Sequence, residues 1–189
     1  LVFFKEPRRG GEAPVATVAE TARNLFTVLT NPRFMIFLLI FSGFWIVFWQ
    51  QYIVLPIYVH GYIDPHADVE LILITDAATV IFLQFLATYL TQKIPAFRAI
   101  TIGTFVTALG WLVVASHPAI WAVILSIFVV AIGEIILSPR YYEYVSRLAP
   151  PGQQGTYMGF AFVPIGIGSL IGGWLGWRLM HYFGEVAQR

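Results

Sequence analysis

A glutamate in the middle of a long apolar segment is the first residue whose chemistry needs an explanation. Glu134 stands in Gly133-Glu134-Ile135-Ile136-Leu137-Ser138-Pro139, after an uncharged run from 119 to 133. An ionised carboxylate in hydrocarbon is costly, so such an acid faces a bundle interior or a water-filled path. Ser138 follows one helical turn later on the same face. The pattern favours a binding or proton-transfer role for Glu134, and the alternative is a structural acid paired with a Lys or Arg on another helix.

Asp76 is the second acid inside an apolar segment, in Thr75-Asp76-Ala77-Ala78. One interpretation is a proton or cation site at membrane depth. The other is an acid near the start of its helix, close to the outer interface, because the helix could begin as late as Leu71. The residues alone leave both open.

Two neighbouring glutamines, Gln50 and Gln51, interrupt an otherwise apolar and aromatic segment. Adjacent positions on a helix point about 100° apart, so one of the two faces inward, and the sequence does not say which. Further along, Gly168, Gly172 and Gly176 recur at intervals of four. Small residues at this spacing let membrane helices approach closely, so the pattern predicts a packing face.

The sequence contains no pattern typical of a catalytic or metal-binding site. The chain has no cysteine, its four histidines show no ligand spacing, and no Ser/His/Asp arrangement follows from spacing. We therefore expect no enzyme activity, no metal ion and no cofactor. The formal net charge of +1 gives no reason to expect nucleic acid as a partner.

The elements that must position these residues are membrane helices. Hydrophobic residues make up 58% of the 189 residues and charged residues only 11%, which excludes an ordinary soluble domain. A bilayer core needs about 20 apolar residues in a helix. Five segments qualify, at about 33–59, 69–91, 99–115, 119–148 and 156–178. Asn31 and Pro32 supply the first helix start. Arg140, Glu143 and Arg147, at spacings of three and four, extend the fourth helix beyond its apolar part.

The distribution of the basic residues predicts which connections between spans lie on the cytoplasmic side of the membrane. Nine of the eleven lie before the apolar part of the first span, between the second and third spans, or between the apolar part of the fourth span and the fifth span. Cytoplasmic loops are rich in Lys and Arg, so these segments are predicted to be cytoplasmic. Residues 1–32 are expected to hold the end of a preceding span and a cytoplasmic linker with an amphipathic helix over 17–29, and residues 33–189 a transmembrane bundle. Five spans imply that a sixth is missing.

Several features together resemble the carboxyl-terminal half of a major facilitator superfamily transporter: the amphipathic linker, the span pattern, the basic loop over 92–98 and the glycine-rich last span. Sharper motifs are Gly133-Glu134 with Ser138-Pro139, then Glu143, Ala149-Pro150 and Met158-Gly159. Their order is similar to the tenth and eleventh helices of the proton-dependent oligopeptide transporters. The resemblance implies that Glu134 receives the amino terminus of a peptide, with Ser138 beside it.

Two positions depart from that family. Trp49 stands where the seventh helix usually carries a coupling glutamate, and Ala161 stands where the eleventh usually carries a tryptophan. Asp76-Ala77 replaces an Asn-Pro pair, so Asp76 is expected to take over proton coupling together with Glu134. Trp49 and Gln50 are expected at the substrate. Gln84 also resembles a feature of drug:proton antiporters in the same superfamily.

The sequence as a whole predicts an all-α integral membrane protein, most of the carboxyl-terminal bundle of a secondary transporter in the plasma membrane. The leading function is proton-coupled symport of di- and tripeptides or similar zwitterions. Its alternatives are proton-coupled efflux of drugs or metabolites and a non-transporting membrane scaffold. The expected partners are a small-molecule or peptide substrate, protons, the bilayer and the amino-terminal half of the same chain.

Overall fold

The structure is a computed structural model that describes residues 17–187, all in helices and their connections with no strand in this range. The predictions for residues 1–16 lie outside it. In chain order the helices are α1 (Val18–Leu29), α2 (Pro32–Phe48), α3 (Gln50–Tyr58), the π-helix η1 (Val59–Ile63), α4 (Val69–Thr91), α5 (Ala96–Ser116), α6 (Ile120–Leu148), α7 (Gln154–Phe160) and α8 (Val163–Ala187).

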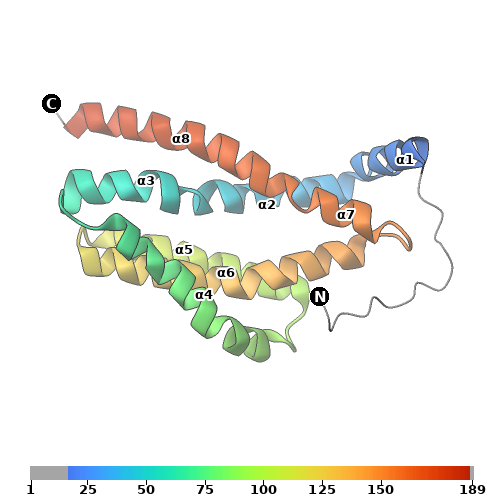
Figure 1. The fold of residues 1–189 in the computed structure, drawn as a ribbon, viewed down its shortest axis with the longest axis horizontal. Coiled ribbons are helices and arrows are strands. Elements are labelled where there is room, and N and C mark those ends of the chain that lie inside the picture. The colour runs from blue at the N-terminus through green and yellow to red at the C-terminus, as the bar shows by residue number, and fades with distance from the viewer. Residues whose placement is uncertain (1–16, 188–189) are drawn as a thin grey trace, which may run out of the picture.

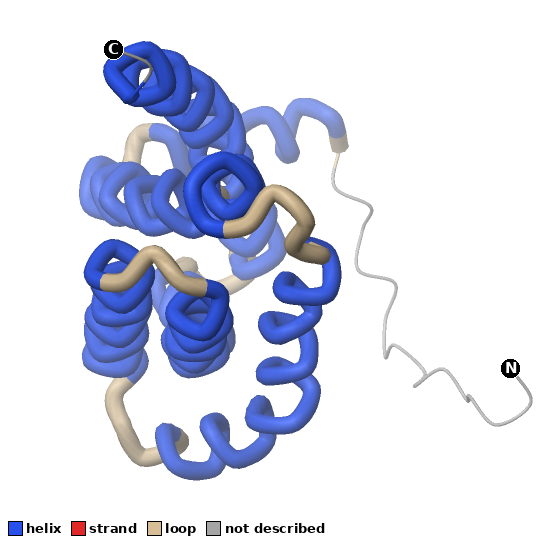
Figure 2. The backbone as a smooth tube through the Cα atoms, turned by 90° about the vertical axis from the view of Figure 1, so that its left-hand side faces the viewer, coloured by secondary structure: helices blue, strands red, loops and turns tan. Residues whose placement is uncertain are grey.

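The helices form two layers that run lengthwise beside one another (Figure 1). One layer holds α2, α3 and α8, and the other holds α4, α5 and α6, with α6 packed on both α4 and α5. Figure 2 looks along the bundle from one end, where some helices are seen nearly end on and others obliquely. The connections alternate between the two ends, so successive long helices run in opposite directions.

Five helical segments of the described chain are long and apolar enough to cross a membrane, which confirms the five predicted spans. They cover Pro32–Ile63, Val69–Thr91, Ala96–Ser116, Ile120–Leu148 and Gln154–Tyr182. The predicted start of the first span is confirmed as well. Asn31 caps α2 by accepting a hydrogen bond from the Phe34 backbone N–H, and Pro32 is the first helical residue.

The first span contains a break at Trp49 that the sequence did not predict. The Gln50 amide nitrogen donates to the Ile46 carbonyl at 2.7 Å, in the place of the backbone N–H that would normally reach that oxygen. Side chains inserted into the helical ladder are a common cause of such breaks. Beyond Pro56 the segment changes from an α-helix to the π-helix η1, where the Asp64 N–H bonds to the Val59 carbonyl.

The fifth span is also divided, between α7 and α8. Pro164 has no backbone N–H, so the carbonyl of Phe160 loses the donor that a continuous helix would supply. The chain bridges the gap with shorter-range bonds such as Phe162 N–H to Gly159 O. The interruption turns α8 along the face of α2 and α3.

The glycine spacing of α8 is a packing face, as predicted. A Cβ at Gly168 would lie within 2.8 Å of the Trp45 carbonyl carbon, and one at Gly172 would lie 3.2 Å from the Ile46 oxygen. The glycines therefore allow α8 to lie directly against the backbone of α2.

Stacked aromatic rings join the two layers. Tyr141 of α6 lies parallel to Phe41 of α2, with ring centroids 4.0 Å apart. Its hydroxyl donates to the carbonyl of Ala161, between α7 and α8, at 2.8 Å. Tyr141 is fully buried and thus ties three parts of the chain together.

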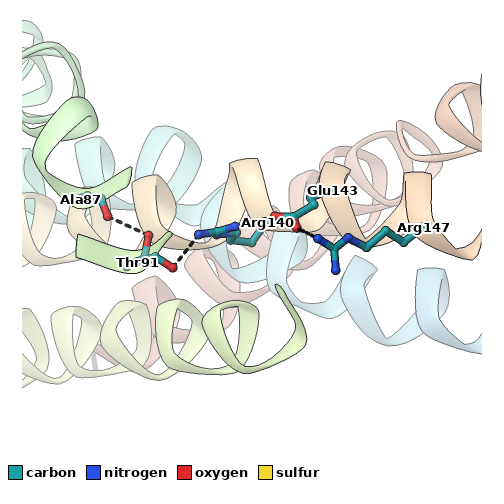
Figure 3. A network of polar contacts seen from close by, with 5 residues as sticks. All are labelled: Ala87, Thr91, Arg140, Glu143 and Arg147. Atoms are coloured by element: carbon teal, nitrogen blue, oxygen red, sulfur yellow. Dashed lines mark hydrogen bonds and ion pairs between the residues drawn. The ribbon is translucent and has the colours of Figure 1, made fainter. Parts of the chain in front are cut away.

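The predicted charge ladder is confirmed at the end of α6 (Figure 3). Glu143 pairs with Arg140 and Arg147 at 2.6 Å each. Arg140 also donates to the backbone carbonyl of Thr91, the last residue of α4, at 2.5 Å. A cation at a helix carboxyl terminus satisfies a free carbonyl and complements the helix dipole. Arg140 therefore fastens the end of α4 to α6.

The amphipathic helix predicted over 17–29 is present as α1. Leu25, Phe26 and Leu29 are exposed, with Phe26 at 68%, as a helix lying in a membrane interface requires. The contact with the bundle comes instead from Val28, which is fully buried in the aromatic core.

Candidate functional site

A hydrogen bond inside the membrane region links α3 to α4. The Tyr52 hydroxyl donates to Asp76 Oδ2 at 2.7 Å. Asp76 is only 8% exposed, and its other oxygen, Oδ1, has no hydrogen-bond partner. Buried carboxylate oxygens are almost always satisfied, so an open Oδ1 marks a place for a proton, a water or a ligand.

Asp76 does not serve as the start of its helix. That role belongs to Asp68, whose side chain accepts from the Leu71 N–H at 3.0 Å. Asp76 lies two turns further into α4, on the face that packs inward. This geometry disfavours the helix-start interpretation left open by the sequence.

Glu134 is placed by the glycine that precedes it. A Cβ at Gly133 would lie 2.6 Å from the carbonyl oxygen of Gly103, so α6 meets α5 backbone to backbone at this point. The close contact fixes the rotation of α6 and directs Glu134 to another side. There Glu134 lies within electrostatic reach of Asp76 and Tyr52, and its side chain is partly exposed.

No described Lys or Arg forms an ion pair with Glu134 or Asp76, since the described salt bridges join only Arg140, Glu143 and Arg147. Asp76 pairs with a tyrosine hydroxyl and not with Glu134. The structural interpretation, in which these acids balance charges across helices, finds no partner in the part of the chain described.

The α6 face that carries Glu134 continues in helical steps of four through Ser138 to Tyr142, all partly exposed. Tyr142 lies within electrostatic reach of Glu134 and against the ring of Phe162, with centroids 5.8 Å apart. Ser138 thus shares the face of Glu134, as the spacing predicted. Tyr142 was missed, although the same spacing extended by one turn points to it.

The two glutamines of the first span have different surroundings. Gln50 faces α8, and its amide nitrogen also donates to the Gly172 carbonyl at 3.1 Å. Gln51 is the inward residue, 1% exposed, with neither amide atom hydrogen-bonded. Trp49 lies at the break between α2 and α3, with its ring 5.9 Å from that of Tyr52 and its Nε1 unpartnered. Gln50 is therefore placed away from Asp76, and Trp49 beside Tyr52.

Tyr52 and Gln51 were not predicted as site residues. Their importance depends on the juxtaposition of α3 with α4, which no local spacing in the sequence encodes. Ala161 has an equally specific explanation. It is fully buried, and its carbonyl accepts from Tyr141, so this position belongs to the core and does not line the polar site.

The arrangement can bind a proton or a positively charged group. Tyr52 of α3 is hydrogen-bonded to Asp76 of α4, and Glu134 of α6 lies within electrostatic reach of both. The described lysines and arginines lie toward the helix ends, chiefly at the end where α4 meets α5 and α6 meets α7. Among residues 17–187, no three His, Cys, Asp or Glu side chains are grouped to hold a metal ion.

Five membrane-length helices with ionisable groups between them define a polytopic membrane protein with a polar site at membrane depth. Residues 1–173 match the sequence profile of the Major Facilitator Superfamily. The chain therefore belongs to this superfamily of secondary membrane transporters, which take small-molecule substrates across a lipid bilayer. No match to the chain was found among curated proteins or among solved structures.

Proposed function

We propose that this chain supplies the carboxyl-terminal bundle of a proton-coupled symporter for di- and tripeptides or similar zwitterions. In this proposal Glu134 receives the substrate ammonium group, with Ser138 beside it. Asp76 carries the coupling proton, and Trp49 contributes an aromatic wall. The observation that supports the proposal most directly is the pair of acids within electrostatic reach of one another and without a basic partner among the described residues.

Gln50 was also expected at the substrate. Its bonds to Ile46 and Gly172 engage its amide nitrogen with backbone carbonyls, so a direct contact with substrate would require those bonds to open. We keep the role as a prediction, to be tested by the affinity of a Gln50→Leu variant.

Proton-coupled efflux of cationic drugs or metabolites is the second candidate. The same two acids, with the aromatic side chains of Trp49, Tyr52 and Tyr142 near them, could bind a hydrophobic cation as well as a peptide amino terminus. A peptide and a hydrophobic cation therefore need to be compared on the same protein.

The deciding experiment measures binding to the full-length protein with the Glu134→Gln substitution. The carboxamide keeps a hydrogen bond and loses the charge, so a free-amine dipeptide should bind about 10- to 1000-fold more weakly, at 1.4 kcal/mol per tenfold. The N-acetylated dipeptide, which binds poorly at the start, should be unaffected. Glu143→Gln is the matched control, because Glu143 is paired with two arginines outside the polar site.

Equal loss for the free and acetylated peptides would contradict the amino-terminus role. A fall in melting temperature without discrimination between the peptides would indicate a structural acid, since breaking a buried pair costs about 3–5 kcal/mol. Retained affinity for a hydrophobic cation, with no dipeptide binding by the parent protein, would favour efflux.

The proposed orientation places residues 92–98 and 140–155 in the cytoplasm of a cell with the transporter in its plasma membrane. The chain has no cysteine, so a single cysteine introduced at position 94 can be labelled without background. An impermeant reagent added outside intact cells should leave it unlabelled, and labelling would reverse the orientation.

A further inference from the structure

We propose that Gln51, Tyr52 and Asp76 form a hydrogen-bond relay whose direction is set by the proton on Asp76, so that the Gln51 carboxamide presents the substrate with an acceptor when Asp76 is ionised and a donor when it is protonated. The inference rests on the proposed proton-coupling role of Asp76. It adds Gln51 as a specificity-determining residue and Tyr52 as a positioning residue.

The geometry centres on a single hydroxyl group. The Tyr52 hydroxyl donates to Asp76 Oδ2 at 2.7 Å, which suits an ionised carboxylate. The Gln51 side chain interacts with the same hydroxyl, and yet neither Nε2 nor Oε1 of Gln51 forms a regular hydrogen bond. A carboxamide that is 1% exposed with both polar atoms open is costly unless something pairs with them.

With Asp76 ionised, one arrangement links the three groups. The Gln51 Nε2–H donates to the Tyr52 oxygen, the Tyr52 O–H donates to Asp76, and Gln51 Oε1 remains open. A proton arriving on Asp76 converts the carboxylate from an acceptor into a donor. The Asp76 O–H then donates to the Tyr52 oxygen, the Tyr52 O–H donates to Gln51 Oε1, and the Gln51 Nε2–H₂ becomes the open group.

The reversal connects the proton to substrate chemistry. An open Nε2–H₂ binds a carbonyl or carboxylate oxygen, and an open Oε1 does not. A substrate with such an acceptor near its ammonium group, as a peptide has, therefore binds better to the protonated site. Linkage requires that the same substrate favours proton uptake by Asp76 to the same extent. This is the thermodynamic sign that symport needs.

The titratable groups that face Asp76 from the helices around it are Tyr52 on α3 and Glu134 on α6. Glu134 is not in the relay, because it forms no hydrogen bond to any of the three residues in the described structure. Its charge acts on Asp76 from a separate helix.

The test is infrared difference spectroscopy on the purified full-length protein between neutral and acidic pH. The carbonyl stretch of protonated Asp76 is identified by its absence in Asp76→Asn. In Tyr52→Phe that band should move to higher frequency, because the carboxylic acid loses the oxygen to which it donates. Gln51→Met should cause a smaller shift in the same direction. Tyr62→Phe is the matched control, since Tyr62 is exposed and stacks on Tyr58 away from Asp76.

A second measurement is dipeptide affinity at the two pH values. We expect the parent to bind about fivefold or more tightly at acidic pH, within the usual range of coupling energies. Tyr52→Phe, Gln51→Met and the double variant Tyr52→Phe/Asp76→Asn should all lose this ratio, with no additivity in the double variant. An Asp76 band unchanged in Tyr52→Phe, or additive effects, would overturn the relay and leave the proton role of Asp76 standing.

Absence of any Asp76 band would overturn the relay together with the proton role. If Tyr52→Phe fails to fold, the Gln51→Met spectrum decides alone, because the same band shift is expected from the other end of the relay.

Discussion

The two faces of α6 have opposite characters. Toward α5, Gly133 meets Gly103 backbone to backbone, and Ser126 donates to the Gly110 carbonyl at 2.8 Å. Toward α3 and α4, the same helix presents Glu134, partly exposed and without an ion-pair partner in the described structure. We call the tightly packed face toward α5 the closed face, and the face that carries Glu134 the open face.

The difference shows how a membrane helix can carry an acid in its middle. The α5 face uses small residues for a long, close contact that fixes the position and rotation of α6. The open face can then hold an acid that close packing would not tolerate, within electrostatic reach of Asp76 and Tyr52. The face toward α5 is thus suited to stability, and the face toward α3 and α4 is where the proposed function places its acid.

The largest effect on function is expected from Asp76→Asn. An asparagine keeps the acceptor for the Tyr52 hydroxyl and cannot carry a proton across the cycle. Gradient-driven accumulation in proteoliposomes should disappear, and substrate exchange should persist. Thr79→Val is the control, because Thr79 lies one turn away and bonds only within its own helix. Full accumulation by Asp76→Asn would remove Asp76 from the coupling mechanism.

The largest effect on stability is expected from Gly133→Ala. The new Cβ would lie 2.6 Å from the Gly103 oxygen and 2.8 Å from the Thr107 nitrogen, so α5 and α6 must move apart. Overpacking typically costs about 1–3 kcal/mol, and because the new Cβ meets backbone atoms we expect the upper end of that range. The melting temperature of the purified protein should fall.

Gly43→Ala makes the same chemical change at a glycine of α2 with no atom within 4 Å of its Cβ position. Alanine is preferred over glycine in a helix by about 1 kcal/mol, so this variant should be neutral or slightly stabilised. Equal destabilisation by both variants would mean that the contact with α5 does not explain the loss of stability in Gly133→Ala.

Much of this fold follows from local sequence. The five spans, the cap at Asn31 and the ladder of Arg140, Glu143 and Arg147 depend on residues close together in the chain, and all are present. The glycine spacing in α8 also predicted its packing role. The breaks were missed because each depends on one carbonyl losing its usual donor, at Ile46 to a side chain and at Phe160 to Pro164.

The candidate site was only partly predictable. Glu134 and Asp76 stand out because charge is costly in an apolar segment, wherever the rest of the chain lies. Tyr52 differs, since a tyrosine is common in a membrane span, and Gln51 was noted only as one of two glutamines of which one faces inward. Their roles arise from α3 lying beside α4, a long-range contact that one sequence does not reveal. The same holds for the contact of Arg140 with the end of α4.

A moderate effect on stability is expected near the carboxyl-terminal end of α6, where Arg140 bonds to the last residue of α4. Arg140→Met leaves the Thr91 carbonyl and Glu143 without their shared donor. Hydrogen bonds to charged groups contribute about 1.5–3 kcal/mol, and Arg140 and Glu143 are 14% and 29% exposed, so the loss of stability should lie at the lower end of that range. Arg147→Met is the control, because Arg147 is 72% exposed and its pair with Glu143 should contribute less than about 1 kcal/mol. Equal losses would show that the link to α4 adds nothing.

The smallest effect is expected on the closed face, from Ser126→Ala. The hydroxyl of Ser126 crosses from α6 to the Gly110 carbonyl of α5 and is nearly inaccessible. Hydrogen bonds between membrane helices average about 0.6 kcal/mol, because the separated helices also find partners within the membrane. The control is Ser42→Ala, an equally buried serine that bonds only to the Leu38 carbonyl of its own helix. Chemical unfolding of both variants should show a small loss for Ser126→Ala and a smaller one for Ser42→Ala. A loss of several kcal/mol at Ser126 would mean that the closed face is held by polar bonds more than by glycine packing, and would reverse the ranking of the two contributions.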